Sequence, residues 1–86
     1  MGLIMDELKA EHLKGLCVIE ATKHLMQKYS LSHDEAYKKL LSTDFYNVLM
    51  NTDAALFLEN DEYIKKSLDL ELLESKDSMY TFIQNN

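Results

Sequence analysis

Histidines and carboxylates are the side chains of this chain best suited to chemistry, so their spacing comes first. His24 follows Glu20 by four residues, which places both on one face of a helix. Helical zinc and di-iron motifs need a second histidine or repeated glutamate–histidine copies, and the sequence has neither. We therefore expect a hydrogen-bonded surface pair at His24 and no metal site. His12 is expected to be partly buried and His33 to be exposed.

The remaining reactive residue types indicate no catalytic site. Cys17 is the only cysteine and lies in the most apolar run of the chain, where a buried, unreactive thiol is expected. The serines fall at predicted caps and turns, and the pairs Asp61/Glu62 and Glu71/Glu74 lie on segments expected to be exposed. No glycine-rich phosphate loop is present. We expect no catalytic residues, no cofactor and no small-molecule substrate.

The charge distribution limits the class of partner. The chain has no Arg, Pro or Trp and a net charge of −6, and residues 51–86 carry eight acids against three lysines. Each phosphate that a nucleic-acid-binding protein neutralises normally needs a Lys or Arg. We therefore expect no nucleic-acid partner. The acidic half is interpreted as a solvated face, with a basic partner as the alternative.

The elements that must position these residues are predicted to be helices throughout. Apolar periodicity and capping residues predict them at about residues 5–29, 32–41, 45–50, 54–58 and 63–73, with caps at 32, 42–44, 51–53 and 60–62. The clearest signal is the capping box Ser32/Glu35. Residues 79–83 are expected to form a final helical turn or a short strand. The predicted fold is all-α: one domain over residues 1–86, a compact bundle of four to five helices with one long N-terminal helix.

The long first helix carries an unusually wide apolar face. Its predicted members are Leu8, His12, Leu16, Val18, Ile19, Leu25, Met26 and Tyr29. Such a face is either central to its own bundle or shared with a partner, and we expect the central position. Gly15 in the helix interior costs about 0.5–1 kcal/mol relative to Ala. This glycine is either tolerated strain or a point where another helix crosses closely.

Several short segments follow one another in a recognisable order. They are LCVIE at 16–20, LS at 31–32, EAYKKLL at 35–41, YNVL at 46–49 and EYI at 62–64. This order resembles a family of short all-helical bacterial proteins of unknown function, often encoded near toxin-like or ADP-ribosyltransferase-like genes. The resemblance covers about residues 13–68 and implies a partner-binding, antitoxin-like role. It transfers no site residues, because DAALF at 53–57 stands where the family has a His-Thr pair.

These observations together predict a small non-enzymatic, bacterial protein that binds another protein or itself. No basic leader and no long apolar run is present, so a cytoplasmic location without a membrane partner is expected. The residues expected to anchor a partner are Tyr46, Phe57 and Tyr63, because aromatic side chains suit interfaces. Two alternatives are a helix–turn–helix nucleic-acid regulator built on residues 31–50 and an acidic inhibitor that mimics nucleic acid.

Overall fold

The computed structural model describes residues 7–85, and every regular element in that part of the chain is helical. The elements are α1 (Glu7–Tyr29), α2 (His33–Leu41), α3 (Asp44–Met50), the 3-10 turns η1 (Thr52–Ala54) and η2 (Leu56–Leu58), α4 (Asp61–Leu73) and α5 (Lys76–Gln84). The predicted all-α class is confirmed. The predicted start of the first helix, at residue 5, lies outside the described residues.

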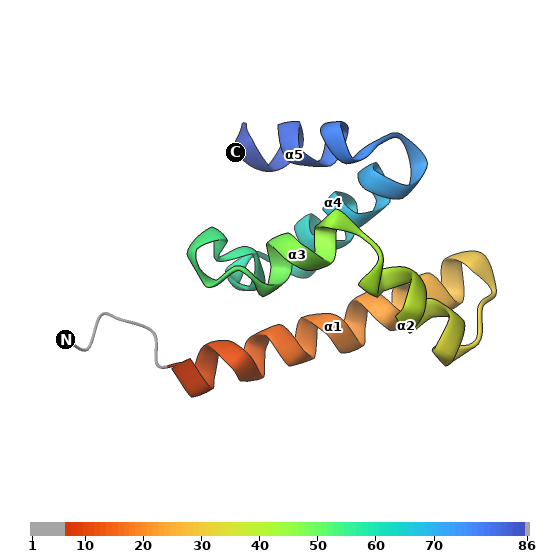
Figure 1. The fold of residues 1–86 in the computed structure, drawn as a ribbon, viewed down its shortest axis with the longest axis horizontal. Helices are drawn as coiled ribbons and strands as arrows, with labels where there is room; N and C mark the ends of the chain where they lie inside the picture. The colour runs from red at the N-terminus through yellow and green to blue at the C-terminus, as the bar shows by residue number, and fades with distance from the viewer. Residues whose placement is uncertain (1–6, 86) are drawn as a thin grey trace.

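Two pairs of helices, α1 with α2 and α4 with α5, are joined through α3 and the 3-10 turns. Figure 1 shows α1 along one side of the molecule, with α3, α4 and α5 all on the same side of it. Leu25, Leu40, Phe45, Leu49 and Leu68 have no accessible surface and form the centre of the core between these layers. Helix α1 is therefore an outer wall of the molecule.

The predicted local caps are confirmed. The Ser32 N–H donates to Glu35 Oε1 at 2.9 Å, and the Glu35 N–H donates to Ser32 Oγ at 3.2 Å, which completes the capping box of α2. Thr43 and Asn60 cap α3 and α4 by accepting the N–H three residues further on. Each of these bonds joins neighbours in the sequence, so helix starts could be predicted without knowledge of the packing.

Helix α3 receives a second cap from a distant carboxylate. Glu71 of α4 accepts the Asp44 N–H at 2.8 Å and the Phe45 N–H at 2.7 Å. The first N–H groups of a helix lack partners within it and carry partial positive charge, so this carboxylate ties α3 to α4. The Tyr80 hydroxyl of α5 donates to Asp44 Oδ2 at 3.0 Å at the same point. The expectation that Glu71 would be exposed is wrong, because its side chain turns toward α3 and is half-buried.

The C-terminal segment forms a nine-residue helix, which corrects the prediction of one turn or a short strand at 79–83. Ser75 Oγ accepts the Ser78 N–H at 3.1 Å, so a stretch that resembles a turn in the sequence is the cap and first turn of α5. Met79 is fully buried, and the rings of Tyr63 and Phe82 pack with their centroids 4.8 Å apart. Helix α5 is therefore packed against α4, and its own apolar pattern is too short to predict a helix without that contact.

Candidate functional site

A buried lysine determines which side of α1 faces the rest of the molecule. Lys14 is 4% exposed, and its ammonium donates to Thr52 Oγ1 at 2.6 Å, the Met50 carbonyl at 3.0 Å and Glu11 Oε2 at 3.1 Å. It also lies 5.7 Å from the centroid of the Phe57 ring. Three acceptors match the three donors of an ammonium, which makes the burial of this charge tolerable.

The inner face of α1 consequently differs from the predicted one. Its buried residues are Ala10, Lys14, Ala21, Thr22 and Leu25. Leu8, Leu16 and Ile19, predicted as core, are 79%, 46% and 51% exposed, and His12 is exposed as well. The prediction is wrong for this part of the helix because it sorted side chains by apolarity. Small alanines and a fully bonded lysine lie inside in place of the larger aliphatic groups.

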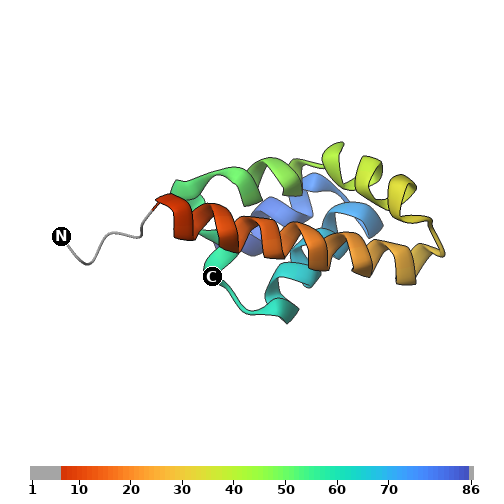
Figure 2. The same ribbon diagram turned by 90° about the horizontal axis from the view of Figure 1, so that it is seen from below.

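The exposed side of α1 forms a continuous stripe, which we call the outer face: Leu8, His12, Gly15, Leu16, Ile19 and Lys23. Steps of four, three and four residues from 8 to 19 keep these positions on one side of a helix. Apart from the two neighbours of Gly15 in the chain and the nearby backbone of α1, no atom lies within 4 Å of the position that a Cβ would take at Gly15. Figure 2 shows α1 as the nearest element in the view from below, running across the molecule uncovered.

The predicted anchoring aromatics are more enclosed than the outer face. Phe57 is 6% exposed and packs beneath the Lys14 ammonium, so its ring belongs to the core. Tyr46 and Tyr63 are half-buried, and Tyr63 packs on Phe82. Phe57 lies on η2, Tyr46 on α3 and Tyr63 on α4. A role in partner binding remains a prediction for Tyr46 and Tyr63.

The histidine pair uses a different carboxylate from the one predicted. His24 Nε2 lies 2.8 Å from Asp69 Oδ1 on α4, and Lys28 Nζ lies 3.2 Å from Asp69 Oδ2. Glu20, the predicted partner, lies 3.9 Å from Lys23 instead. One carboxylate shared by two cation-forming side chains ties α1 to α4. The contacts of Asp69 with His24 and Lys28 therefore orient the C-terminal part of α1, as the contacts of Lys14 orient its N-terminal part.

The cysteine is enclosed enough to be unreactive, although it is half-buried and not fully buried as predicted. Its Sγ lies 3.9 Å from the Phe57 carbonyl oxygen. Burial, with a smaller contribution from the negative charge of Asp61, raises the pKa of the Cys17 thiol. The thiol therefore stays protonated at neutral pH, and only a thiolate is a good nucleophile.

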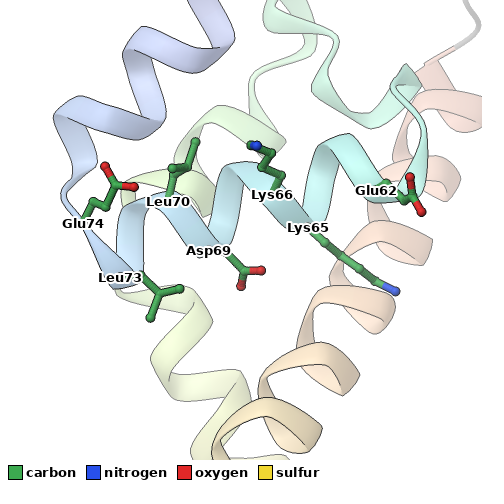
Figure 3. A pocket seen from close by; sticks show the side chains of 7 residues that line it. All are labelled: Glu62, Lys65, Lys66, Asp69, Leu70, Leu73 and Glu74. Carbon is green, nitrogen blue, oxygen red and sulfur yellow. The ribbon is translucent and has the colours of Figure 1, made fainter.

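A shallow hollow of about 360 Å³ lies along α4 and is shown in Figure 3. Its lining side chains come from this one helix and from Glu74, the residue that follows it: Glu62, Lys65, Lys66, Asp69, Leu70, Leu73 and Glu74. Lys65 pairs with Asp61 at 3.0 Å, and Asp69 contacts His24 and Lys28. Because its lining combines three acids with two lysines, the hollow presents no concentrated charge of either sign.

Among residues 7–85, no group of three or more His, Cys, Asp and Glu side chains is placed to hold a metal ion. No helix in that same range combines the length and the apolar character needed to cross a membrane. Comparison with protein-family models, with curated proteins and with solved structures finds no match to this chain.

Proposed function

We propose that this chain is a non-enzymatic protein-interaction module, a helical bundle with α1 as one outer wall, whose binding surface is the outer face. The observation that carries the proposal is the exposure of Leu16 and Ile19, about half of each side chain, in the helical turn that follows the open position at Gly15. Single exposed apolar residues are ordinary on protein surfaces, but a contiguous apolar stripe is characteristic of interaction sites.

The charges around α3 oppose the helix–turn–helix alternative, in which α3 would be the recognition helix. The segment from residue 44 to 50 contains Asp44 and no lysine. The N-terminal part of a recognition helix contacts base edges between phosphate backbones. Here that end carries the Asp44 and Glu71 carboxylates. Two negative charges at this position would be repelled by DNA.

The nucleic-acid mimic would need an array of free carboxylates at regular spacing. Several acids of the C-terminal half are instead engaged inside the chain: Asp61 with Lys65, Asp69 with His24 and Lys28, and Glu71 with the N-terminus of α3. These contacts give the carboxylates structural roles. They favour a protein-binding module, and the antitoxin-like role implied by the family resemblance is one form that such a module would take.

A photo-reactive residue placed on the outer face tests the proposal. We expect Ile19→p-benzoylphenylalanine to form a covalent adduct, with itself or with a partner in the native cell, and Leu16→Glu in the same chain to suppress it. Leu73 on α4 is 62% exposed and is the matched control position, at which the same replacement should give no adduct. Absence of any adduct at position 19, or equal adduct formation at 73, would contradict the proposal.

A further inference from the structure

We infer that the outer face binds a second copy of this chain, with the two α1 helices antiparallel and related by a two-fold axis that passes between Gly15 and Leu16. This inference rests on the proposed function and adds the identity of the partner. A two-fold interface requires a surface that is complementary to itself, so each residue must suit the one related to it by the axis.

The outer face meets this requirement in the antiparallel direction. An axis between positions 15 and 16 places Leu16 of each copy at the level of Gly15 in the other. There, apart from the two chain neighbours of Gly15 and the nearby helix backbone, no atom of the same chain lies within 4 Å of a Cβ position. A leucine side chain thus enters the space that the glycine leaves open. The same axis sets Ile19 against His12. The large side chains of Leu16 and Ile19 therefore face the small Gly15 and the flat ring of His12.

A parallel arrangement fits less well because every residue would face its own copy. Gly15 would meet Gly15 and leave a gap, while Lys23 would meet Lys23 at one end of the stripe. In the antiparallel arrangement Lys23 lies at the level of Leu8, which its aliphatic stem can cover while the ammonium stays in water. Opposed helix dipoles also favour the antiparallel direction.

Charges along one edge of the outer face agree with this register. Lys9, Glu20 and Lys23 lie on the same edge, and in an antiparallel pair the same edges meet. Each Glu20 already lies 3.9 Å from its own Lys23. Lys9 of the other copy falls about two residues from it along the axis, or about 3 Å. Each exposed carboxylate would therefore lie between two ammonium groups.

The size of the surface makes this a weak, reversible dimer. Residues 8–23 span about 23 Å of helix, and a helix is about 10 Å wide, so the footprint is about 230 Å². A standard stable interface buries about 800 Å² on each partner. Each copy also carries a net charge of −6, which opposes association at low salt. We expect dissociation constants between about 1 µM and 1 mM, decreasing as salt is added.

Sedimentation equilibrium over about 1 µM to 1 mM of the full chain measures the association directly. Ile19→Lys is expected to weaken it at least about tenfold, and Leu73→Lys, which makes the same change in charge at an exposed aliphatic position on α4, is expected to leave it unchanged. Gly15→Ala provides a sharper test. It should raise the thermal midpoint of the monomer, because alanine is the better helix former, and it should weaken the dimer by filling the space for Leu16.

Disulfide trapping tests the register in a chain whose own thiol is removed by Cys17→Ala. Leu16→Cys should form a covalent dimer across the axis, whereas Leu8→Cys should not, because antiparallel copies hold position 8 about 23 Å apart along the helix axis. Trapping at both positions would overturn the antiparallel arrangement. A monomer at every concentration would overturn self-association. If position 19 still formed adducts with another protein, the proposed function would stand without this inference.

Discussion

Lys14→Ala is expected to destabilise the protein more than Ile19→Ala, although an isoleucine is normally the better core residue. The stem of Lys14 is buried, and truncation of a buried aliphatic chain costs about 2–5 kcal/mol. Its hydrogen bonds to Thr52, Met50 and Glu11 are lost as well, but the ammonium no longer has to be removed from water, and these two effects largely cancel. We expect a loss of about 2–3 kcal/mol, near the lower end of the range for truncation.

Ile19→Ala should have a much smaller effect. Complete burial of an isoleucine side chain contributes about 1.5–3 kcal/mol, and half of this side chain is already in water. Alanine also recovers a few tenths of a kcal/mol of helix propensity at an exposed position. The net loss should therefore stay below about 1 kcal/mol.

Urea unfolding followed by circular dichroism at 222 nm, at a protein concentration well below the dissociation constant of the dimer, measures both changes in the monomer. With a slope of about 1 kcal/mol per molar urea, Lys14→Ala should lower the midpoint by about 2–3 M and Ile19→Ala by less than about 1 M. Lys14→Met is the matched control, because it keeps the buried stem and removes the charge, and it should change stability by less than about 1 kcal/mol. The reverse order for the two alanine variants would refute this orientation of α1 and, with it, the outer face.

Three other predictions concern the helix ends. Ser30 has a φ of 55°, so Ser30→Gly should raise the free energy of unfolding by about 0.5–1 kcal/mol, and no gain in urea midpoint would contradict the left-handed conformation. Glu71→Ala should cost about 1.5–3 kcal/mol by uncapping α3, against less than about 0.5 kcal/mol for the exposed neighbour Glu74→Ala; equal losses would contradict the cap. Hydrogen bonds from Ser32 lower the pKa of Glu35 below its ordinary value of 4.5. Its stabilising effect is therefore complete above pH 4.5 and lost as the pH falls through the lowered pKa, so wild type should lose stability relative to Glu35→Gln in acid, and parallel pH profiles would contradict this.

The parts of this structure that could be predicted from the sequence are those determined over three or four residues. The capping box of Ser32 and Glu35 and the pair of Asp61 and Lys65 each join positions within one turn, so their geometry follows from helix formation alone. The all-α class follows from the same signals repeated along the chain. None of these contacts depends on how one helix lies against another.

The rotation of α1 and the second cap of α3 could not be predicted in this way. Thr52 and Met50 are 38 and 36 residues from Lys14, and Glu71 is 26 residues from Phe45. A helical wheel predicts that a lysine is exposed, because the groups that accept its hydrogen bonds come close to it only after the chain has folded. The apolar face of the first helix could be predicted, with the core and a partner as alternatives, but the expected core position is wrong for Leu8, Leu16 and Ile19 for the same reason.

The burial of Lys14 and the exposure of Ile19 both follow from the way α1 is rotated about its own axis. Ile19 lies nine residues from Ala10, which on an α-helix is half a turn around the axis, so the two cannot be buried on the same side. Burial of Leu16 and Ile19 would turn Lys14 away from Thr52 and Met50 and would put branched side chains where Ala10 and Ala21 now allow close approach. The inner packing of α1 therefore keeps its larger aliphatic groups in water. Their burial against a second copy would recover part of that apolar surface without disturbing the lysine, which is why the monomer's packing and the proposed dimer support each other.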